Sequence, residues 1–209
     1  MKLLYATGNN SKIYNMKRRL EGLPIEIVTP KELGIKIDIV EDGETEVENA
    51  LKKALIYYEK TKMPTIAGDS GLYIENLPKE KQPGLFVRRV NGKELSDDEM
   101  INYYSDLINS VGGKSVSYYI TGLALVGEDK IFTTEIKEDE FILSSIVSKN
   151  LNHRGNPLDV MTIDPTINKY YTEMSDEEFK HLGQIFDTKC INFIKTNLLD
   201  DKKIKLLNL

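Results

Sequence analysis

The spacing of apolar and polar residues predicts a strand, a helix and a second strand in the first thirty positions. Residues 2–6 are an apolar run typical of a short buried strand. Residues 25–29 alternate between apolar and polar side chains, as the residues of a half-buried strand do. Between the two strands, good capping residues at 9–11 precede apolar residues at helical spacing. The apolar positions of that helix are Ile13, Met16 and Leu20.

The strongest helical pattern covers residues 44–62. Its apolar stripe consists of Val47, Ala50, Leu51, Ala54, Leu55 and Tyr58. Residues 65–74 follow as a predicted strand that a Gly-Asp-Ser-Gly bend interrupts. A cap at Ser96 then opens a further predicted helix over residues 96–110.

The second half of the chain is richer in strand-forming residues. Residues 115–145 carry many Tyr, Ile, Thr, Val and Phe side chains around a Gly-Glu-Asp turn, which predicts an antiparallel hairpin or meander. Residues 158–163 are a candidate for a further strand. A capping box at Ser175 opens a helix that we expect to run to about Leu199. The pattern as a whole predicts a mixed α/β fold.

Length and composition narrow the class of protein. We expect one domain over residues 1–209, with a peripheral polar tail after about residue 200. There are 33 acidic and 28 basic residues, which gives no reason to expect a nucleic-acid partner. No apolar run approaches the length of a membrane span. One cysteine and two histidines cannot supply an internal disulfide or a Cys/His zinc site, so we expect a cytoplasmic protein.

The segment after the first predicted strand is a candidate phosphate-binding loop. Residues 7–12 read Thr-Gly-Asn-Asn-Ser-Lys and lead into the first helix. Backbone N–H groups at a helix start attract anions, and the lysine adds a full positive charge. Threonine and asparagine side chains can donate further hydrogen bonds to phosphate oxygens. A simpler interpretation is a capped helix start that binds no ligand.

Carboxylates gather at two places. Glu41, Asp42 and Glu44 precede the long helix, and Asp69 lies in the Gly-Asp-Ser-Gly segment. Because Mg²⁺ prefers oxygen ligands, usually one or two carboxylates together with substrate phosphates, these acids are candidate metal ligands. Without a metal, the first group is a solvated helix start and the second is an ordinary turn.

Basic residues offer candidate phosphate contacts. Lys53 lies four positions after Asn49, so the two side chains can share one helix face. Arg88 and Arg89 form a basic pair that can also bind phosphate. Each of these residues, taken singly, is more simply explained as solvated surface charge.

Five segments, taken in order, resemble one known family. They are ATGNNSK at 6–12, EDGETEVENALKKA at 41–54, AGDSGLYIENL at 67–77, PGLFVRRVNG at 83–92 and TEMSDEEF at 172–179. In order and spacing they are similar to the Ham1-like family of inosine triphosphate pyrophosphatases. The resemblance covers about residues 2–180.

The resemblance implies a Mg²⁺-dependent hydrolase. Such an enzyme cleaves a nucleoside triphosphate between its α and β phosphates and releases nucleoside monophosphate and pyrophosphate. The substrates it implies are non-standard purine nucleotides such as ITP, XTP and dITP. It further implies a homodimer and an elongated mixed sheet flanked by helices, in two lobes with the nucleotide in a central cleft.

Roles for individual residues follow from the resemblance and from the candidate phosphate contacts. Catalytic roles are expected for Asp69, Lys12 and Lys53, with Asp69 as the base for the attacking water. Metal binding is expected of Glu41 and Asp69. Substrate binding is expected of Thr7, Gly8, Asn9, Lys12, Lys53, Ser70, Arg89 and Asp159.

The chain departs from the family's pattern at three places. Gly68 stands where the family usually has an acid before Asp69. Where the family usually has Phe-Gly-aromatic-Asp, this chain has Asn-Pro-Leu-Asp and keeps only Asp159. The Ser-His-Arg that the family has near the end of its pattern is absent from residues 179–185. The phosphate half of the pattern is kept and the base half is changed. Two alternatives therefore stand beside the pyrophosphatase: a non-catalytic nucleotide-binding or regulatory protein, and a hydrolase of another phosphorylated metabolite.

Overall fold

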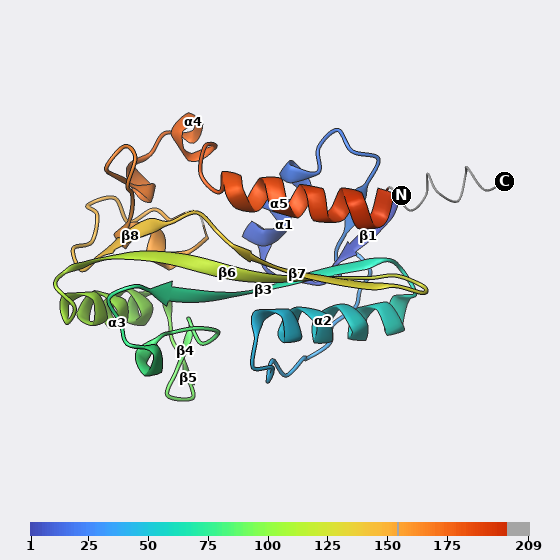
Figure 1. The fold of residues 1–209 in the computed structure, drawn as a ribbon, viewed down its shortest axis with the longest axis horizontal. Coiled ribbons are helices and arrows are strands. Elements are labelled where there is room, and N and C mark those ends of the chain that lie inside the picture. The colour runs from blue at the N-terminus through green and yellow to red at the C-terminus, as the bar shows by residue number, and fades with distance from the viewer. Residues whose placement is uncertain (154, 200–209) are drawn as a thin grey trace. The chain divides into compact units, whose positions relative to one another are not determined.

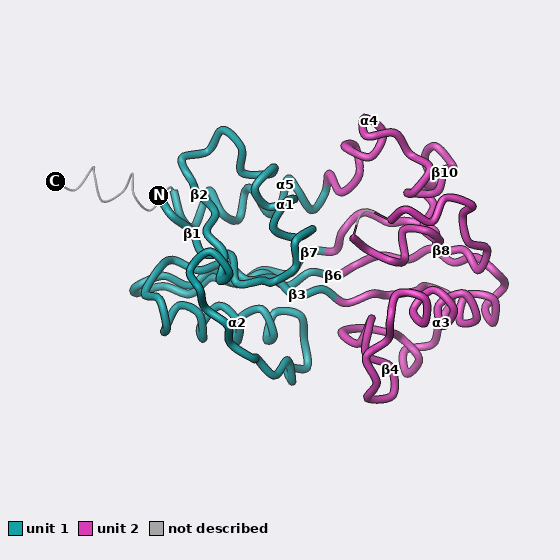
Figure 2. The backbone as a smooth tube through the Cα atoms, turned by 180° about the vertical axis from the view of Figure 1, so that it is seen from behind, with its two compact units in different colours: residues 1–70, 121–136, 185–209 teal, residues 71–120, 137–184 magenta. Residues whose placement is uncertain are grey.

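The structure, a computed structural model, describes residues 1–153 and 155–199 (Figure 1). The chain divides into two compact units, which Figure 2 shows in different colours. Unit 1 consists of residues 1–70, 121–136 and the described part of 185–209, and unit 2 consists of residues 71–120 and 137–184. Strands β3 (Thr65–Ile74) and β6 (Lys114–Val126) contribute residues to both units. The tail predicted after about residue 200 lies outside the described residues.

Unit 1 has parallel strands with helices on both faces. Its other elements are β1 (Lys2–Tyr5), α1 (Asn10–Arg19), β2 (Glu26–Val28), α2 (Glu46–Thr61), β7 (Ile131–Lys137), α5 (Gln184–Ile194) and a π-helical turn (Lys195–Leu199). Strand β1 pairs in parallel with β2 on one side and with β3 on the other. Figure 1 shows α1 and α5 on one face of these strands and α2 on the opposite face.

The two faces of β1 belong to two different cores, because successive strand residues point to opposite sides of a sheet. Leu3 and Tyr5 pack with α1 and α5. Leu4 and Ala6 pack with α2. The layer under α2 is made largely of small residues, namely Ala6, Ala50, Ala54, Ala67 and Ala124. Helix α2 therefore lies close to the sheet.

Unit 2 is built on antiparallel pairs. Its other elements are β4 (Arg89–Val90), β5 (Lys93–Glu94), α3 (Asp97–Asn109), β8 (Phe141–Ser144), β9 (Thr162–Asp164), β10 (Lys169–Tyr170) and α4 (Asp176–Phe179), with 3₁₀ turns at Lys79–Lys81, Pro157–Met161 and Tyr171–Glu173. Strand β8 pairs with β6 and β9, and β10 pairs with β9, all antiparallel. The core contains large side chains such as Met100, Tyr104 and Phe141.

The predicted fold class is confirmed. The main sheet has eight strands with mixed pairing, in the order β10-β9-β8-β6-β3-β1-β2 and with β7 on β6, and helices flank it. Residues 2–6, 25–29 and 96–110 form the predicted elements within one or two residues. The predicted turn of the central meander is also present, since Gly127 N–H donates to the Lys130 carbonyl at 2.9 Å.

Three predicted elements were wrong in detail. The expected bend in residues 65–74 is absent from this described segment, because β3 runs through Gly-Asp-Ser-Gly as one strand. The helix expected from Ser175 to Leu199 is broken at Gly183, whose φ of +72° ends a helical path. Residues 158–163 are mostly a 3₁₀ turn and supply only the start of a short strand.

The buried face of α2 is also turned relative to the predicted stripe. The predicted Ala50 and Ala54 are buried, but so are Glu46, Asn49 and Tyr57, which the stripe omitted. Two polar side chains therefore point from α2 toward the sheet. Burial of polar groups at one end of a helix is unusual without hydrogen-bond partners.

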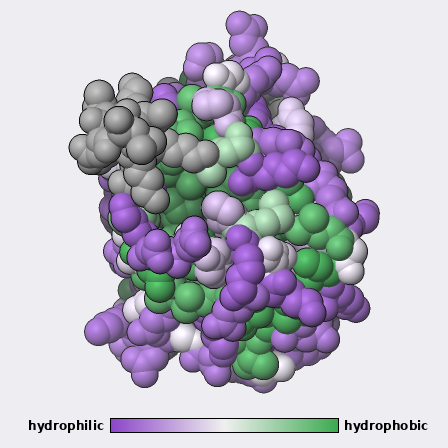
Figure 3. Space-filling view, turned by 90° about the vertical axis from the view of Figure 1, so that its right-hand side faces the viewer, coloured by the Kyte–Doolittle hydropathy of each residue, from purple (hydrophilic) through white to green (hydrophobic). Residues whose placement is uncertain are grey.

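One face of the molecule, seen in Figure 3, is mostly hydrophilic with apolar side chains gathered between the polar ones. Exposed apolar residues in unit 1 include Val40 and Ile131. In the parts of the chain that the structure describes, no helix combines the length and the apolar character needed to cross a bilayer.

Candidate active site

The segment after β1 forms a tight turn into α1. The Asn9 side chain caps the helix, since its Oδ1 accepts from the Lys12 backbone N–H at 3.1 Å. Thr7 Oγ1 accepts from the Asn9 backbone N–H at 3.1 Å. Gly8 is exposed, and a Cβ placed on it would meet no atom within 4 Å. The predicted cap is present, and it presents the first backbone N–H groups of α1 as a helix start does for an anion.

This turn follows β1, which is the parallel neighbour of the strand that carries Asp69. Tyr5 of β1 is the partner of Ile66, and the Ala6 N–H donates to the Ile66 carbonyl at 2.8 Å. The carboxyl end of β1 therefore lies beside the residues of β3 that precede Asp69. Helices α1 and α2 follow β1 and β2 on opposite faces, so β1 and β3 mark the place where the connections switch sides (Figure 1). Ligands of open α/β sheets bind at such a place, outside the carboxyl ends of the strands.

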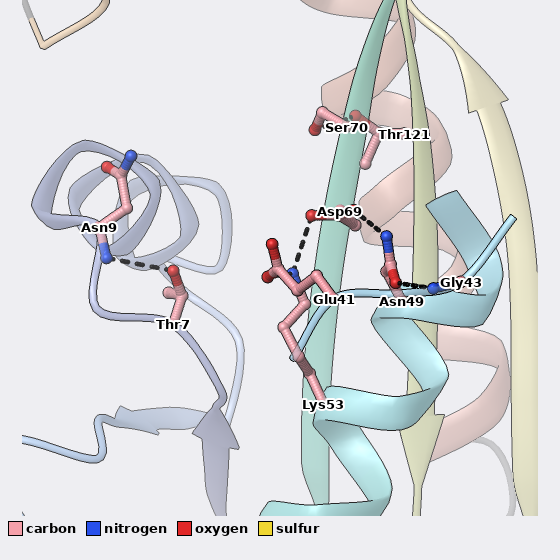
Figure 4. Close-up of polar contacts among 9 residues, drawn as sticks. All are labelled: Thr7, Asn9, Glu41, Gly43, Asn49, Lys53, Asp69, Ser70 and Thr121. Carbon is pink, nitrogen blue, oxygen red and sulfur yellow. Dashed lines mark hydrogen bonds and ion pairs between the residues drawn. The ribbon is translucent and has the colours of Figure 1, made fainter. Parts of the chain in front are cut away.

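Glu41, Lys53 and Asp69 meet at one point, although they come from a loop, a helix and a strand. Lys53 Nζ lies 2.9 Å from Glu41 Oε1 and 2.8 Å from Asp69 Oδ1. The Lys53 and Asp69 side chains are 12% and 15% exposed, whereas that of Glu41 is 41% exposed. Figure 4 shows the three side chains converging. Two carboxylates and one ammonium thus form a partly buried charged group that a ligand can still reach from the Glu41 side.

A second pair of contacts fixes this group from inside. Asn49 Nδ2 donates to Asp69 Oδ2 at 3.0 Å, and Asn49 Oδ1 accepts from the Gly43 N–H at 2.8 Å. The prediction that Asn49 and Lys53 share a helix face is confirmed, because both reach Asp69 from α2. On the next residue of β3, Ser70 Oγ lies 2.6 Å from Thr121 Oγ1 of β6.

Two glycines shape the surroundings of Asp69. A Cβ on Gly122 of β6 would lie 2.3 Å from Val47 N and 2.4 Å from the Glu46 carbonyl carbon, so only glycine lets the first turn of α2 rest on the strand. A Cβ on Gly68 would lie 3.1 Å from a Leu123 methyl group, on the face away from α2. An acid at position 68 would therefore point away from Asn49 and Lys53.

The remaining predicted site residues belong to unit 2. Arg89 is an exposed residue of β4. Asp159 lies in the 3₁₀ turn Pro157–Met161 and is 7% exposed. Beside it in the sequence, Asn156 Nδ2 donates to the Tyr119 hydroxyl at 3.3 Å, and burial raises the pKa of that hydroxyl. The structure therefore brings together the predicted acids Glu41 and Asp69 and the helix lysine Lys53 within unit 1, while Arg89 and Asp159 belong to unit 2.

A divalent cation fits the donor set in unit 1. One carboxylate oxygen of Glu41 and one of Asp69 already contact a positive charge, the Lys53 ammonium. Carboxylate oxygens are also the ligands that hard divalent cations prefer. No group of three or more His, Cys, Asp or Glu side chains within residues 1–153 and 155–199 has the geometry of a metal site. Substrate phosphates would have to complete the coordination of a cation held by these two carboxylates.

Three residues of the site were not predicted from the sequence: Asn49 as a partner of Asp69, Thr121 as a partner of Ser70, and Gly122 under α2. Asn49 carried a usable signal, since it lies at i−4 from Lys53 on the same face. Thr121 and Gly122 are distant in the sequence from their partners, and no local pattern marks them.

Curated relatives match the chain over most of its length. A "dITP/XTP pyrophosphatase" from a Thermoanaerobacter species is 32% identical over 201 residues, which covers 95% of this chain and 98% of the relative. The protein of the same name from Caldanaerobacter subterraneus is 33% identical over 180 residues, covering 85% of this chain and 87% of the relative.

Solved structures share the fold. A HAM1 protein from Coxiella burnetii superposes with a TM-score of 0.77 at 23% identity, covering 94% of this chain and 99% of that one. A structure from Mycobacterium abscessus, described as a nucleoside-triphosphatase or dITP/XTP pyrophosphatase, gives a TM-score of 0.65 at 21% identity and covers 95% of this chain and 100% of that one. At these identities the likeness establishes the fold alone.

The model of the Ham1 family matches residues 3–184, a span that includes the turn after β1, the Glu41 loop, α2, and the Asp69 segment of β3. Enzymes of this family generally use a divalent metal ion. The chain belongs to the Ham1 family.

Proposed function

We propose that this protein is a Mg²⁺-dependent nucleoside triphosphate pyrophosphohydrolase that removes non-standard purine nucleotides such as ITP, XTP and dITP. The convergence of Glu41, Lys53 and Asp69 from three separate segments carries the proposal. It is supported by the relatives that are named dITP/XTP pyrophosphatases.

In this proposal the residues of unit 1 divide the work. Glu41 and Asp69 would hold the Mg²⁺ ion, which would neutralise charge on the phosphates. Thr7, Gly8 and Asn9 present donors to the phosphates at the start of α1, and Lys12 and Lys53 add positive charge. Asp69 orients the attacking water and takes its proton, and Ser70 contacts the substrate beside it. Arg89 and Asp159 of unit 2 are proposed to bind substrate, and their roles stay predictions.

The activity is tested by pyrophosphate release from ITP, XTP, dITP and the standard nucleotides, with Mg²⁺ and with a chelator. We expect metal-dependent release, and a loss of about a thousandfold in kcat for Asp69→Asn, because a positioned base contributes on that scale. Asp42→Asn is the matched control: it removes an exposed acid from the same loop, whose partner is Lys52 rather than Lys53. Folded protein that releases no pyrophosphate from any nucleotide would exclude the proposal.

Base choice is the part of the function in which this chain differs from its family's usual pattern. The segment where the family has Ser-His-Arg runs here from the end of α4 into the start of α5 and reads Phe179 followed by Gly183-Gln184-Ile185. Preference for ITP or XTP in the same assay would mean that other residues replace that contact. Equal release from all bases would mean that the phosphate site acts without base discrimination.

A non-catalytic nucleotide-binding protein is the second candidate, and Gly68 favours it. The acid that the family usually has at this position is missing, and the carboxylates that converge on Lys53 are those of Glu41 and Asp69. A nucleotide that raises Tm without pyrophosphate release would support this candidate. Hydrolysis of another phosphorylated metabolite, with no turnover of nucleotides, would instead indicate the remaining alternative, a hydrolase of such a metabolite.

The substrate, the oligomeric state and the location of the protein follow from the same proposal. We propose that the substrate is a free nucleoside triphosphate, that the protein acts as a homodimer, and that it works in the cytoplasm. The family resemblance supports the dimer. Sedimentation of the purified protein tests it directly.

A further inference from the structure

Asn49 connects two segments that otherwise have separate places in the fold. It lies in the first turn of α2 and is 2% exposed. One end of its amide contacts Asp69 on β3, and the other contacts the Gly43 backbone in the loop that carries Glu41 (Figure 4). One buried side chain thus touches both acid-bearing segments.

The chemistry of its partners fixes the orientation of this amide. The Asp69 carboxylate, held by Lys53, accepts hydrogen bonds, so it requires the Asn49 NH₂ group. The Gly43 N–H can only donate, so it requires the Asn49 oxygen. Turning the amide over would lose both hydrogen bonds and leave buried polar groups unpaired.

The contacts restrain both acids. Asp69 Oδ2 is held by Asn49 and Oδ1 by Lys53, so the carboxylate has little freedom to rotate. At the oxygen end of the Asn49 amide, a Cβ on Gly43 would lie 2.8 Å from Asn49 Oδ1 and 2.9 Å from Glu48 Cβ. Only glycine allows the loop to approach Asn49 this closely, and Glu41 lies two residues before it.

We propose that Asn49 is a positioning residue that sets the placement of Asp69 relative to Glu41. This inference rests on the proposed function, in which these carboxylates hold the metal ion and activate water. Groups that orient metal ligands commonly change metal affinity or activity by about 10- to 100-fold when they are removed.

Three variants separate this role from a merely structural one. Asn49→Ala removes both hydrogen bonds. Asn49→Asp keeps an acceptor for Gly43 and loses the donor to Asp69. Thr45→Ala is the matched control, because Thr45 caps the same turn of α2 by accepting from the Glu48 N–H at 3.2 Å and has no part in holding Asp69.

Two measurements are made on each variant: Mn²⁺ binding to the protein alone, by electron paramagnetic resonance, and steady-state pyrophosphate release. For Asn49→Ala we expect about tenfold weaker Mn²⁺ binding and about tenfold lower kcat with KM nearly unchanged. For Asn49→Asp we expect Mn²⁺ binding at least as tight as in the wild type, because a third carboxylate joins the site, with kcat still low. Thr45→Ala should stay within about twofold of the wild type in both measurements.

If Asn49→Ala and Thr45→Ala had the same Mn²⁺ affinity and the same kcat, the inference would be overturned. A wild-type kcat in Asn49→Asp would overturn it as well. The two proposals fail in different ways. If wild-type protein releases no pyrophosphate, the pyrophosphatase proposal fails, and Mn²⁺ binding alone still decides the role of Asn49.

Discussion

The helix layers of the two units differ in thickness, and so do the polar contacts that they allow. In unit 1, α2 meets the sheet through Ala50, Ala54 and the bare backbone of Gly122. In unit 2, α3 meets its strands through large side chains such as Met100 and Tyr104. A thin layer brings helix side chains within hydrogen-bond distance of strand residues, as Asn49 and Lys53 are of Asp69. A thick apolar layer separates them.

One ion pair from each unit illustrates a difference in burial. In unit 1, the Lys53–Asp69 pair is nearly buried. In unit 2, Lys93 pairs with Glu99 at the surface, where the side chains are 66% and 44% exposed. There the Lys93 ammonium and the Ser96 capping contacts lower the pKa of Glu99 to about 2. The nearly buried pair thus lies under the helix that meets the sheet through small residues.

The largest expected effect is on the buried ion pair. Lys53→Met should lower the free energy of unfolding by about 3 kcal/mol, because Asp69 and Glu41 would lose their shared cation in a partly dry place. Lys93→Met, which breaks an exposed pair, should cost less than about 1 kcal/mol. Urea unfolding of both variants measures the difference. Equal losses would mean that the two pairs are not distinguished by burial.

The close packing of α2 on the sheet is tested by adding one methyl group to Gly122. Gly122→Ala should lower the free energy of unfolding by about 2 kcal/mol, because backbone atoms of Glu46 and Val47 occupy the space of the new methyl group. At Gly127 in the turn after β6, the nearest atom to a Cβ is 4.0 Å away, so Gly127→Ala should change stability by less than about 0.5 kcal/mol. A tolerated Gly122→Ala would show that α2 can move away from β6 at little cost.

The thick layer of unit 2 predicts a response to alkali. Tyr104 is fully buried, its hydroxyl donates to the Val87 carbonyl at 3.0 Å, and burial raises its pKa. A raised pKa gives stability that is present below the unfolded value of about 10 and is lost as pH rises above it. Compared with Tyr104→Phe, the wild type should lose about 1.4 kcal/mol between pH 9 and pH 11. Urea unfolding at both pH values measures this, and a constant difference between the two proteins would contradict it.

The smallest expected effect is stabilisation by the metal ion in unit 1. Mg²⁺ at about three times its dissociation constant should add about 0.8 kcal/mol to the free energy of unfolding. The Tm shift should disappear in Glu41→Gln and persist in Asp42→Asn, since only Glu41 shares Lys53 with Asp69. A Tm that does not respond to Mg²⁺, with or without nucleotide, would count against metal binding at these acids.

Much of the fold could be predicted from the sequence, because periodicity and caps are local signals. The capped starts near Asn9 and Ser96 are where the pattern places them. The bend expected at Gly-Asp-Ser-Gly was wrong because pairing with neighbouring strands carries β3 through residues that, alone, favour a turn. The break at Gly183 was missed because a positive φ follows from how the chain packs rather than from its pattern.

The site was predictable to the extent that its members share local spacing or a family motif. Glu41, Lys53 and Asp69 were all candidates, and the structure brings them together, while their roles stay predictions. Asn49 was named only as a neighbour of Lys53, because a polar residue in a helix is usually assigned to the solvent side. The contacts of Thr121 and Gly122 depend on strand register between residues far apart in the sequence, which no local pattern encodes.

The position of α5 constrains how the chain can fold during synthesis. Phe186, Cys190 and Ile194 complete the core that covers one face of β1, and Asp187 binds both Arg18 and Arg19 of α1. Asp187 follows Arg18 by 169 residues and Arg19 by 168, so the α1 face of unit 1 lacks these partners while unit 2 is being made. Unit 1, which holds the proposed catalytic acids, is therefore completed only after the residues of unit 2 have been made.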